Sequence, residues 1–232
     1  MEILARADQD LTITEISHAL KVHRTIGHRL VATLEQRDLV YRTPGGGYRL
    51  GAGLIRLAGA INRDLRAVAR PFLAELNAQT DETVHLAVLS RAQVFFIDCH
   101  ESSKALRVVS RAGRAYPVHS TSVGKAMLAA LDDGEVLPLL PNPRLEKLTA
   151  KTIASRSELL GQLAIIRERG YAMSAQEAEE GVGSVAVAIR DRQRALRGAL
   201  SIAAPVVRFT PAAVTGFARA LQGAAQAVGE RI

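Results

Sequence analysis

The order of apolar and polar positions near the start of the chain predicts two helices separated by a tight turn. Thr12 and Glu15 have the spacing of a capping box, which marks the start of a helix. The apolar face of this helix consists of Ile13, Ile16, Ala19 and Leu20. Residues 21–23 interrupt the pattern and form the turn, and a short helix over 2–7 is predicted to precede the pair.

A second helix is predicted from Arg24 to Arg37, because apolar residues recur there every four positions. We expect its buried stripe to be formed by Ile26, Leu30 and Leu34. The start of the opposite face is polar and contains Arg24, Thr25, His28 and Arg29. In a helix-turn-helix, this part of the second helix meets base edges in the major groove.

Two β-prone segments, 39–42 and 48–50, flank the run Thr43-Pro44-Gly45-Gly46-Gly47, which can turn but cannot hold regular structure. They predict a hairpin wing on which Arg42 and Arg49 reach backbone phosphates. An apolar stripe over 51–66 then predicts a connecting helix. One small domain would leave that stripe uncovered, so we expect it to pack against a second subunit.

Beyond Pro71 the pattern mixes helices with strands, beginning with an amphipathic helix and a hairpin that turns at 90–93. Strands are predicted at 83–89, 94–98, 106–110, 171–174, 184–189 and 196–203, and helices at 122–131, 158–169 and 211–228. Such a mixture implies an antiparallel sheet in an α+β domain. The predicted organisation is a winged helix-turn-helix over 1–50, a linker helix over 51–67 and the α+β domain over 68–232.

The distribution of charge along the chain indicates a binding partner. Residues 21–63 contain eight cations but only two anions, Glu35 and Asp38, so this stretch carries nearly all of the formal net charge of +7. A basic patch on a helix and a hairpin is the pattern expected of a phosphate-binding surface. A solvated basic face on a packing domain is the plainer alternative.

Composition argues against several other classes of protein. The apolar runs are too short for a membrane helix and the acidic first residues are unlike a secretory signal, so we expect a cytoplasmic protein without a membrane role. The single cysteine, Cys99, allows no intrachain disulfide and is expected to pack as a small core residue. Nothing in the sequence indicates a cofactor.

The segment LTITEISHALKVHRTIGHRLVATLEQRDLVYRTPGGGYRLGAGLIRLA, from Leu11 to Ala58, resembles the DNA-binding domain of the IclR family of transcription regulators. Gly27 is a departure, because the family usually has a larger apolar residue there. Together with the basic patch, the resemblance implies contacts to double-stranded DNA from Lys21, Arg24, Thr25, His28, Arg29, Arg42, Tyr48 and Arg49.

Two later segments, HSTSVGKAMLA (119–129) and GYAMSAQEAEEGVGSVAVAIRD (170–191), are similar to signature segments of the IclR effector domain. The resemblance implies a GAF-like fold with a pocket for a small-molecule effector. By the same resemblance the pocket positions are Tyr116, Ser122, Val123, Ser174, Ser184, Ser201 and Ala203. Ser174 and Ala203 differ from the acidic and hydroxyl residues that some members carry there.

A helix that begins near Ser122 would direct free backbone amides and its positive dipole end at a ligand carboxylate. We therefore expect an organic-acid effector. The serines also have plainer interpretations, since Ser122 can simply cap its helix while Ser184 and Ser201 sit in strands.

Ser122-Val123-Gly124-Lys125 satisfies S-x-x-K, a serine and lysine pairing found in acyl-transferring enzymes. The partner motifs of those enzymes are missing, because there is no S-D-N and the only K-T dipeptide is followed by Ile153. We therefore expect that the protein is not an enzyme. A serine acyl hydrolase using Ser122 and Lys125 is the alternative, and a scaffold protein without a DNA role is a third, which the basic helix and wing disfavour.

The sequence also offers two weak metal candidates. His85, Cys99, His100 and His119 match no zinc spacing, and Glu177, Glu179 and Glu180 are more typical of a solvated loop. We assign no metal. The resulting hypothesis is a repressor or activator that binds a palindromic operator as a homodimer or homotetramer, with effector binding altering the two DNA-reading heads.

Overall fold

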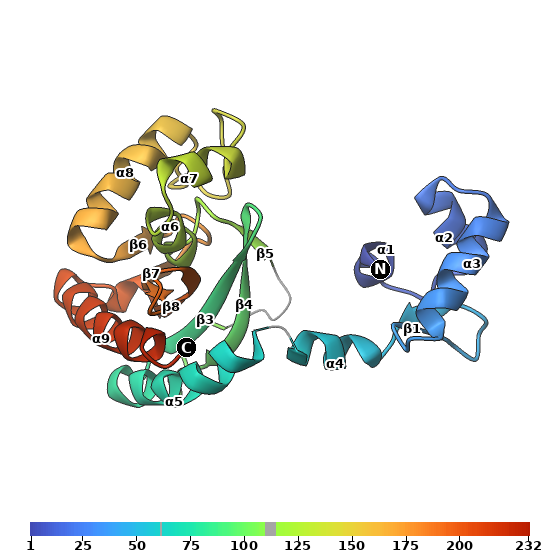
Figure 1. Ribbon diagram of the computed structural model, residues 1–232, viewed down its shortest axis with the longest axis horizontal. Helices are drawn as coiled ribbons and strands as arrows, with labels where there is room; N and C mark the ends of the chain where they lie inside the picture. Colours follow the sequence, from blue (N-terminus) through green and yellow to red (C-terminus); the bar gives the residue numbers. More distant parts are fainter. Residues whose placement is uncertain (61, 110–114) are drawn as a thin grey trace. The chain divides into compact units, whose positions relative to one another are not determined.

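The computed structural model describes residues 1–60, 62–109 and 115–232, which form two compact units (Figure 1). The first unit is Met1–Arg63 and the second is Asp64–Ile232. The division falls inside the predicted linker, 51–67. No helix in the described ranges is both long enough and apolar enough to cross a membrane.

The first unit is a winged helix-turn-helix, as the sequence predicts. Its elements are α1 (Glu2–Arg6), α2 (Ile13–Leu20), α3 (Arg24–Glu35), β1 (Val40–Arg42), β2 (Tyr48–Leu50) and α4 (Gly53–Ala60). The capping box is present, since the Glu15 amide donates to Thr12 Oγ1 and the Thr12 amide donates to the Glu15 carboxylate at 2.7 Å. Lys21 ends α2 in the left-handed conformation, which turns the chain towards α3.

The buried side of α3 differs from the prediction. Gly27 and Val31 face the core, whereas Ile26 and Leu30 are 50% and 47% exposed. A Cβ atom on Gly27 would lie 2.0 Å from Ser17 Oγ, so the two helices cross most closely at this glycine. The pattern of apolar residues missed this side of the helix because Gly27, the first of its buried residues, has no side chain.

The connecting segment is two helices where one was predicted. α4 ends at Ala60, Asn62 has a left-handed φ of 49°, and α5 (Arg63–Thr80) then continues through Pro71, after which a separate helix had been expected. An interior proline costs about 3 kcal/mol. The helix continues because its apolar stripe is fully covered by the sheet, and this stripe consists of Leu65, Ala69, Leu73 and Leu76.

The second unit contains a six-stranded antiparallel sheet in the order β5-β4-β3-β8-β7-β6. The strands are β3 (Thr83–Ser90), β4 (Gln93–His100), β5 (Ala115–Pro117), β6 (Ala172–Ala175), β7 (Val182–Arg190) and β8 (Leu196–Pro205). The predicted hairpin turn at 90–93 forms between β3 and β4, with Arg91 at a φ of 55°. The predicted α+β fold class is confirmed.

Helices cover both faces of this sheet (Figure 1). α5 and α9 (Pro211–Gly229) pack on one face, and a short 3₁₀ helix, η1 (Val206–Arg208), lies between β8 and α9. The other face carries α6 (Ser122–Ala129), α7 (Asp133–Leu139) and α8 (Arg156–Arg169). Small residues on the strands beneath α6 let this helix approach the sheet, namely Ala87, Ala186 and Ala199.

One local prediction in this unit fails, and two elements were missed. Residues 106–109 form no strand, and residue 110, the end of that predicted strand, lies outside the described residues. The elements β5 and α7 were not predicted at all. Residues 101–109 are irregular because their backbone oxygens bond to side chains of other elements, as when Thr83 Oγ1 donates to Val108 O at 2.6 Å.

Candidate DNA-binding surface and ligand cavity

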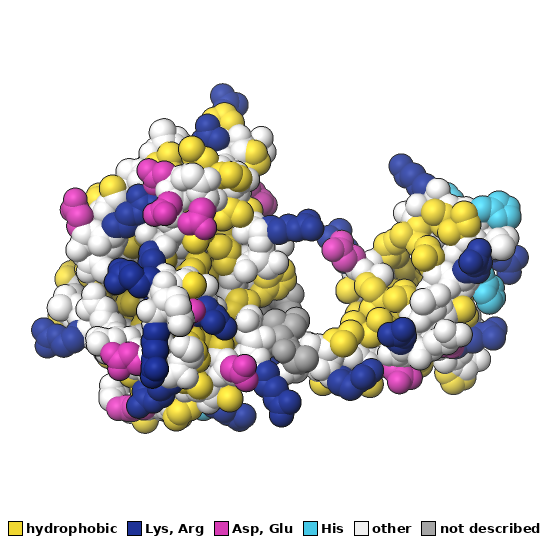
Figure 2. Space-filling view, viewed as in Figure 1, with side chains coloured by type: hydrophobic (Ala, Val, Ile, Leu, Met, Phe, Trp, Pro, Cys, Tyr) yellow, Lys and Arg dark blue, Asp and Glu magenta, His cyan; other side chains and the backbone are white. Residues whose placement is uncertain are grey.

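Five of the predicted DNA contacts share one exposed surface of the first unit. Lys21, Arg24, Thr25, His28 and Arg29 are all exposed, in the turn before α3 and in its first turns. Figure 2 shows Lys, Arg and His side chains gathered over this part of the unit. The α3 N-cap is His23, whose Nδ1 accepts from the Thr25 amide at 3.4 Å. The start of α3 is therefore ordered, polar and cationic.

The wing contributes fewer free contacts than the sequence suggests. Arg42 is exposed, but Arg49 pairs with Asp10. Hydrogen bonds from Thr43 and then Arg49 lower the pKa of Asp10, so this carboxylate stays charged beside the arginine. Tyr48 is a correction to the predicted contacts. It is only 6% exposed and packs in the core of the unit, because alternate positions along a two-stranded ribbon face inward.

The second unit holds a cavity between the sheet and the N-terminus of α6. All seven pocket positions implied by the resemblance line it: Tyr116, Ser122, Val123, Ser174, Ser184, Ser201 and Ala203. Every strand of the sheet contributes at least one lining residue, with Phe96 coming from β4 and His85 from β3. Whether these residues bind an effector stays a prediction.

The polar end of the cavity lies where α6 begins. Ser122 Oγ and Ser184 Oγ are 2.7 Å apart, and Ser174 Oγ donates to Ser120 O at 3.0 Å. Thr121 caps α6 by accepting from the Gly124 amide at 3.0 Å. The amides of Ser122 and Val123 precede the first intrahelical bond, so they are the donors that a helix start offers to an anion.

His85 is a cavity residue that the sequence analysis considered only as a metal candidate. Its ring packs against Phe96 with centroids 4.6 Å apart, and Nδ1 has no hydrogen-bond partner among the described residues. Burial lowers the pKa of His85 to about 4, so the ring is neutral at pH 7. The sequence signal that could have identified His85 as a cavity residue is its position as a polar residue inside the mostly apolar run TVHLAVL.

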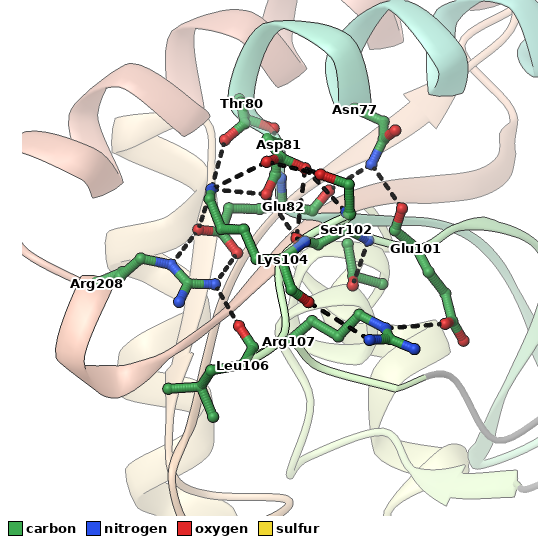
Figure 3. Close-up of polar contacts among 12 residues, drawn as sticks. Asn77, Thr80, Asp81, Glu82, Glu101, Ser102, Lys104, Leu106, Arg107 and Arg208 are labelled. Carbon is green, nitrogen blue, oxygen red and sulfur yellow. Dashed lines mark hydrogen bonds and ion pairs between the residues drawn. The ribbon is translucent and has the colours of Figure 1, made fainter.

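One wall of the cavity is the irregular segment 101–109, which supplies Val108 and Val109. Polar contacts fasten this segment to the rest of the unit (Figure 3). Arg208 binds the carboxylate of Glu82, with Nη2 at 2.8 Å from Oε2, and donates to Leu106 O at 2.9 Å. Lys104 Nζ reaches the same carboxylate at 3.1 Å and the Asp81 carbonyl at 2.7 Å.

The S-x-x-K motif does not form a catalytic pair. Lys125 Nζ lies 2.8 Å from both carboxylate oxygens of Glu177 and 3.2 Å from Gln162 Oε1, while Ser122 Oγ bonds to Ser184. Lys125 is 1% exposed, and burial lowers its pKa although Glu177 acts in the opposite direction. The pair ties α6 to the loop after β6, whose residues Ala178 and Glu179 also line the cavity.

Two of the metal candidates, His119 and Glu177, have other partners. His119 Nε2 contacts Glu146 O at 2.7 Å, and Glu177 pairs with Lys125. Across the described residues, no three His, Cys, Asp or Glu side chains come together as metal ligands.

A winged helix-turn-helix joined in one chain to a domain with an internal cavity defines a transcription regulator with a separate ligand-binding domain. Comparison with known proteins gives the family. Residues 1–44 match the IclR helix-turn-helix domain, and residues 58–230 match the bacterial transcriptional regulator IclR C-terminal domain. The chain belongs to the IclR family of transcriptional regulators.

Three similar proteins illustrate the family. The HTH-type transcriptional regulator XynR of Escherichia coli is 34% identical over 96% of this chain and 90% of its own length. An IclR regulator from Alicyclobacillus acidocaldarius has a TM-score of 0.84 at 29% identity, covering 98% and 93% of the two chains. An IclR homolog from Microbacterium hydrocarbonoxydans, complexed with 4-hydroxybenzoate, has a TM-score of 0.81 at 25% identity, covering 97% and 93%.

Proposed function

We propose that this regulator binds an organic acid in the cavity of its second unit, and that the bound acid changes its affinity for operator DNA. The observation that carries this proposal is the convergence of the seven pocket positions on one cavity at the start of α6. Serine hydroxyls and the first amides of α6 supply donors for a carboxylate. A relative of 25% identity was crystallised with 4-hydroxybenzoate, which is a carboxylic acid.

The acid is tested by adding a panel of aliphatic, aromatic and sugar carboxylates to the full chain and measuring the melting temperature and operator affinity. We expect at least one acid to raise the melting temperature and change operator affinity. Ser122→Ala should weaken its binding about tenfold, since one hydrogen bond to a charged group is lost. Ser157→Ala, at an exposed serine of α8, is the matched control. Failure of every acid to bind would contradict the proposal.

For the DNA side, we propose that α3 reads base edges through Arg24, Thr25, His28 and Arg29 while Lys21 and the wing contact phosphates. Arg29→Ala should weaken operator binding and relax base preference at one position. Arg42→Ala should weaken binding to all sequences and reduce the salt slope by about one. Arg49→Ala should have the smaller effect of the two wing variants, because Asp10 already pairs with Arg49.

We also propose that the chain acts as a homodimer on a palindromic operator in the cytoplasm. The support is the exposure of large apolar side chains on α4, where Ile55 is 77% and Leu57 is 49% exposed. Contact of apolar side chains with water is unfavourable, and a second copy of the chain related by twofold symmetry would cover them. Ile55→Glu should shift the protein towards monomers in sedimentation experiments, whereas Arg56→Glu on the same helix should not.

We propose, finally, that the chain is a regulator without enzymatic activity. Lys125 is held by Glu177 and Gln162, and Ser122 Oγ pairs with Ser184 Oγ rather than with Lys125. Hydrolysis of an acyl ester that disappears in Ser122→Ala would restore the hydrolase alternative.

A further inference from the structure

His85 presents a buried polar atom that the folded chain leaves unpaired. The residue is 5% exposed, and its Nδ1 is the one buried side-chain nitrogen or oxygen, among those described, that lacks a hydrogen-bond partner. Leaving such an atom unpaired costs about 1–3 kcal/mol. His85 also lines the cavity, so a ligand that enters there and shifts the side chains covering Nδ1 could satisfy this atom.

The position of His85 in the sheet separates it from the polar end of the cavity. On β3, His85 is paired in register with Ser201 of β8, while Ser184, the partner of Ser122, lies on β7. Two strand spacings, about 10 Å, lie between β3 and β7. The cavity thus has one set of donors at the start of α6 and a second, different group towards its other end.

The surroundings of His85 favour an uncharged oxygen over a second carboxylate. The ring packs against Phe96, and the ring of Tyr116 meets Phe96 edge-on at 5.8 Å between centroids. Because burial holds the pKa of His85 near 4, the imidazole is neutral and offers one donor and one acceptor. Such a group pairs well with a hydroxyl or carbonyl oxygen, whereas an anion gains most at the amides of α6.

We propose that His85 is a second anchor for the effector, which hydrogen-bonds through Nδ1 to a hydroxyl or carbonyl oxygen remote from the ligand's carboxylate. This inference rests on the proposed acid-binding function of the cavity. The ligand class it names is a carboxylic acid that carries a hydroxyl or carbonyl oxygen remote from its carboxylate. The carboxylate meets the start of α6, the body of the ligand lies over the Phe96 side of the cavity, and the remote oxygen reaches β3.

The test uses pairs of acids that differ only in the remote oxygen. Benzoate with 4-hydroxybenzoate, and cyclohexanecarboxylate with 4-oxocyclohexanecarboxylate, are titrated into the full chain by calorimetry. We expect the oxygenated member of at least one pair to bind ten times tighter or more, since the plain member leaves Nδ1 unpaired. His85→Leu should reduce this preference to less than twofold. His85→Asn, which places an amide near the position of Nδ1, should restore part of it.

The outcomes separate this inference from the function on which it rests. If both members of every pair bind the wild type equally well, or if His85→Leu keeps the full preference, the role of His85 is wrong while the acid-binding cavity stands. If no acid of any kind binds, the proposed function fails and the inference fails with it. The ¹⁵N resonance of His85 Nδ1 in the wild type provides a readout that needs no variant. It should shift with the oxygenated acid and shift much less with the plain one.

Discussion

At the scale of single residues, a missing side chain determines how closely the helices of the helix-turn-helix pack. Gly27 lies against Ser17, whose hydroxyl donates to Ile13 O at 2.7 Å and is therefore held in place. Glycine inside a helix normally costs about 1 kcal/mol relative to alanine. The close packing of α2 against α3 offsets this cost. This packing leaves no room for a larger residue at position 27.

Gly27→Ala should therefore destabilise the first unit by about 1 kcal/mol, because overpacking costs about 1–3 kcal/mol and the gain in helix propensity returns only part of it. Urea denaturation and operator affinity of the full chain measure the effect. Ser17→Ala combined with Gly27→Ala removes the hydroxyl that the new Cβ atom would meet and should recover most of the loss. A gain in stability from Gly27→Ala alone would contradict this account.

The buried imidazole of His85 makes stability depend on pH. Its pKa is about 4 in the folded chain and about 6.5 when unfolded, so below pH 6.5 the unfolded chain binds a proton that the folded chain does not. Stability is therefore complete above pH 6.5 and is lost as the pH falls towards 4, by at most about 3 kcal/mol. In urea denaturation, the stability of wild type relative to His85→Leu should fall across this window. Parallel profiles for the two proteins would show that His85 is not held neutral.

At the scale of elements, the wall formed by residues 101–109 depends on a buried carboxylate. Glu82 is 3% exposed and is held by Arg208 and Lys104. Arg208→Ala removes one partner and also frees Leu106 O, so we expect a loss of about 2 kcal/mol and faster hydrogen exchange in this segment. Arg107→Ala breaks a more exposed ion pair with Glu101 and should cost less than about 1 kcal/mol. Equal effects of the two variants would contradict the proposed importance of Glu82.

Elements with strong local signals could be predicted from the sequence, and those that depend on distant contacts could not. The capping box of α2 and the glycine after α8, Gly170 with a φ of 78°, mark helix ends through local chemistry alone. By contrast, β5 is three residues long and exists through its pairing with β4. Residues 106–109 have the composition of a strand, but two of their carbonyl oxygens accept hydrogen bonds from the side chains of Thr83 and Arg208.

The candidate site, too, could be predicted only in part from the sequence. The seven pocket positions came from a family resemblance, because nothing in the spacing of serines along the chain indicates that they share a cavity. His85 was not among them. A residue type and its alternation can be read from a strand, but an unpaired Nδ1 is a property of everything packed around it and exists only in the folded chain.

At the scale of the whole molecule, the proposed regulation requires that the cavity in the second unit and the DNA-binding surface in the first share one equilibrium. α4 and α5 connect the units in sequence, so the order or spacing of two DNA-reading heads in a dimer is the property that a ligand would bias. Thermodynamic linkage makes this idea quantitative. A ligand that changes operator affinity by some factor must have its own affinity changed by operator DNA by the same factor.

We therefore expect an acid selected by the melting-temperature panel to change operator affinity between about 5-fold and 150-fold, the usual range of allosteric coupling. Calorimetric titration of the same acid into protein already saturated with operator should give a dissociation constant changed by that same factor. An acid that binds tightly but leaves operator affinity unaltered would show that the cavity is not coupled to DNA binding. A change in operator affinity without the reciprocal change would place the acid's action at a site other than the cavity, and Ser122→Ala, which weakens only cavity binding, would then leave the effect on DNA intact.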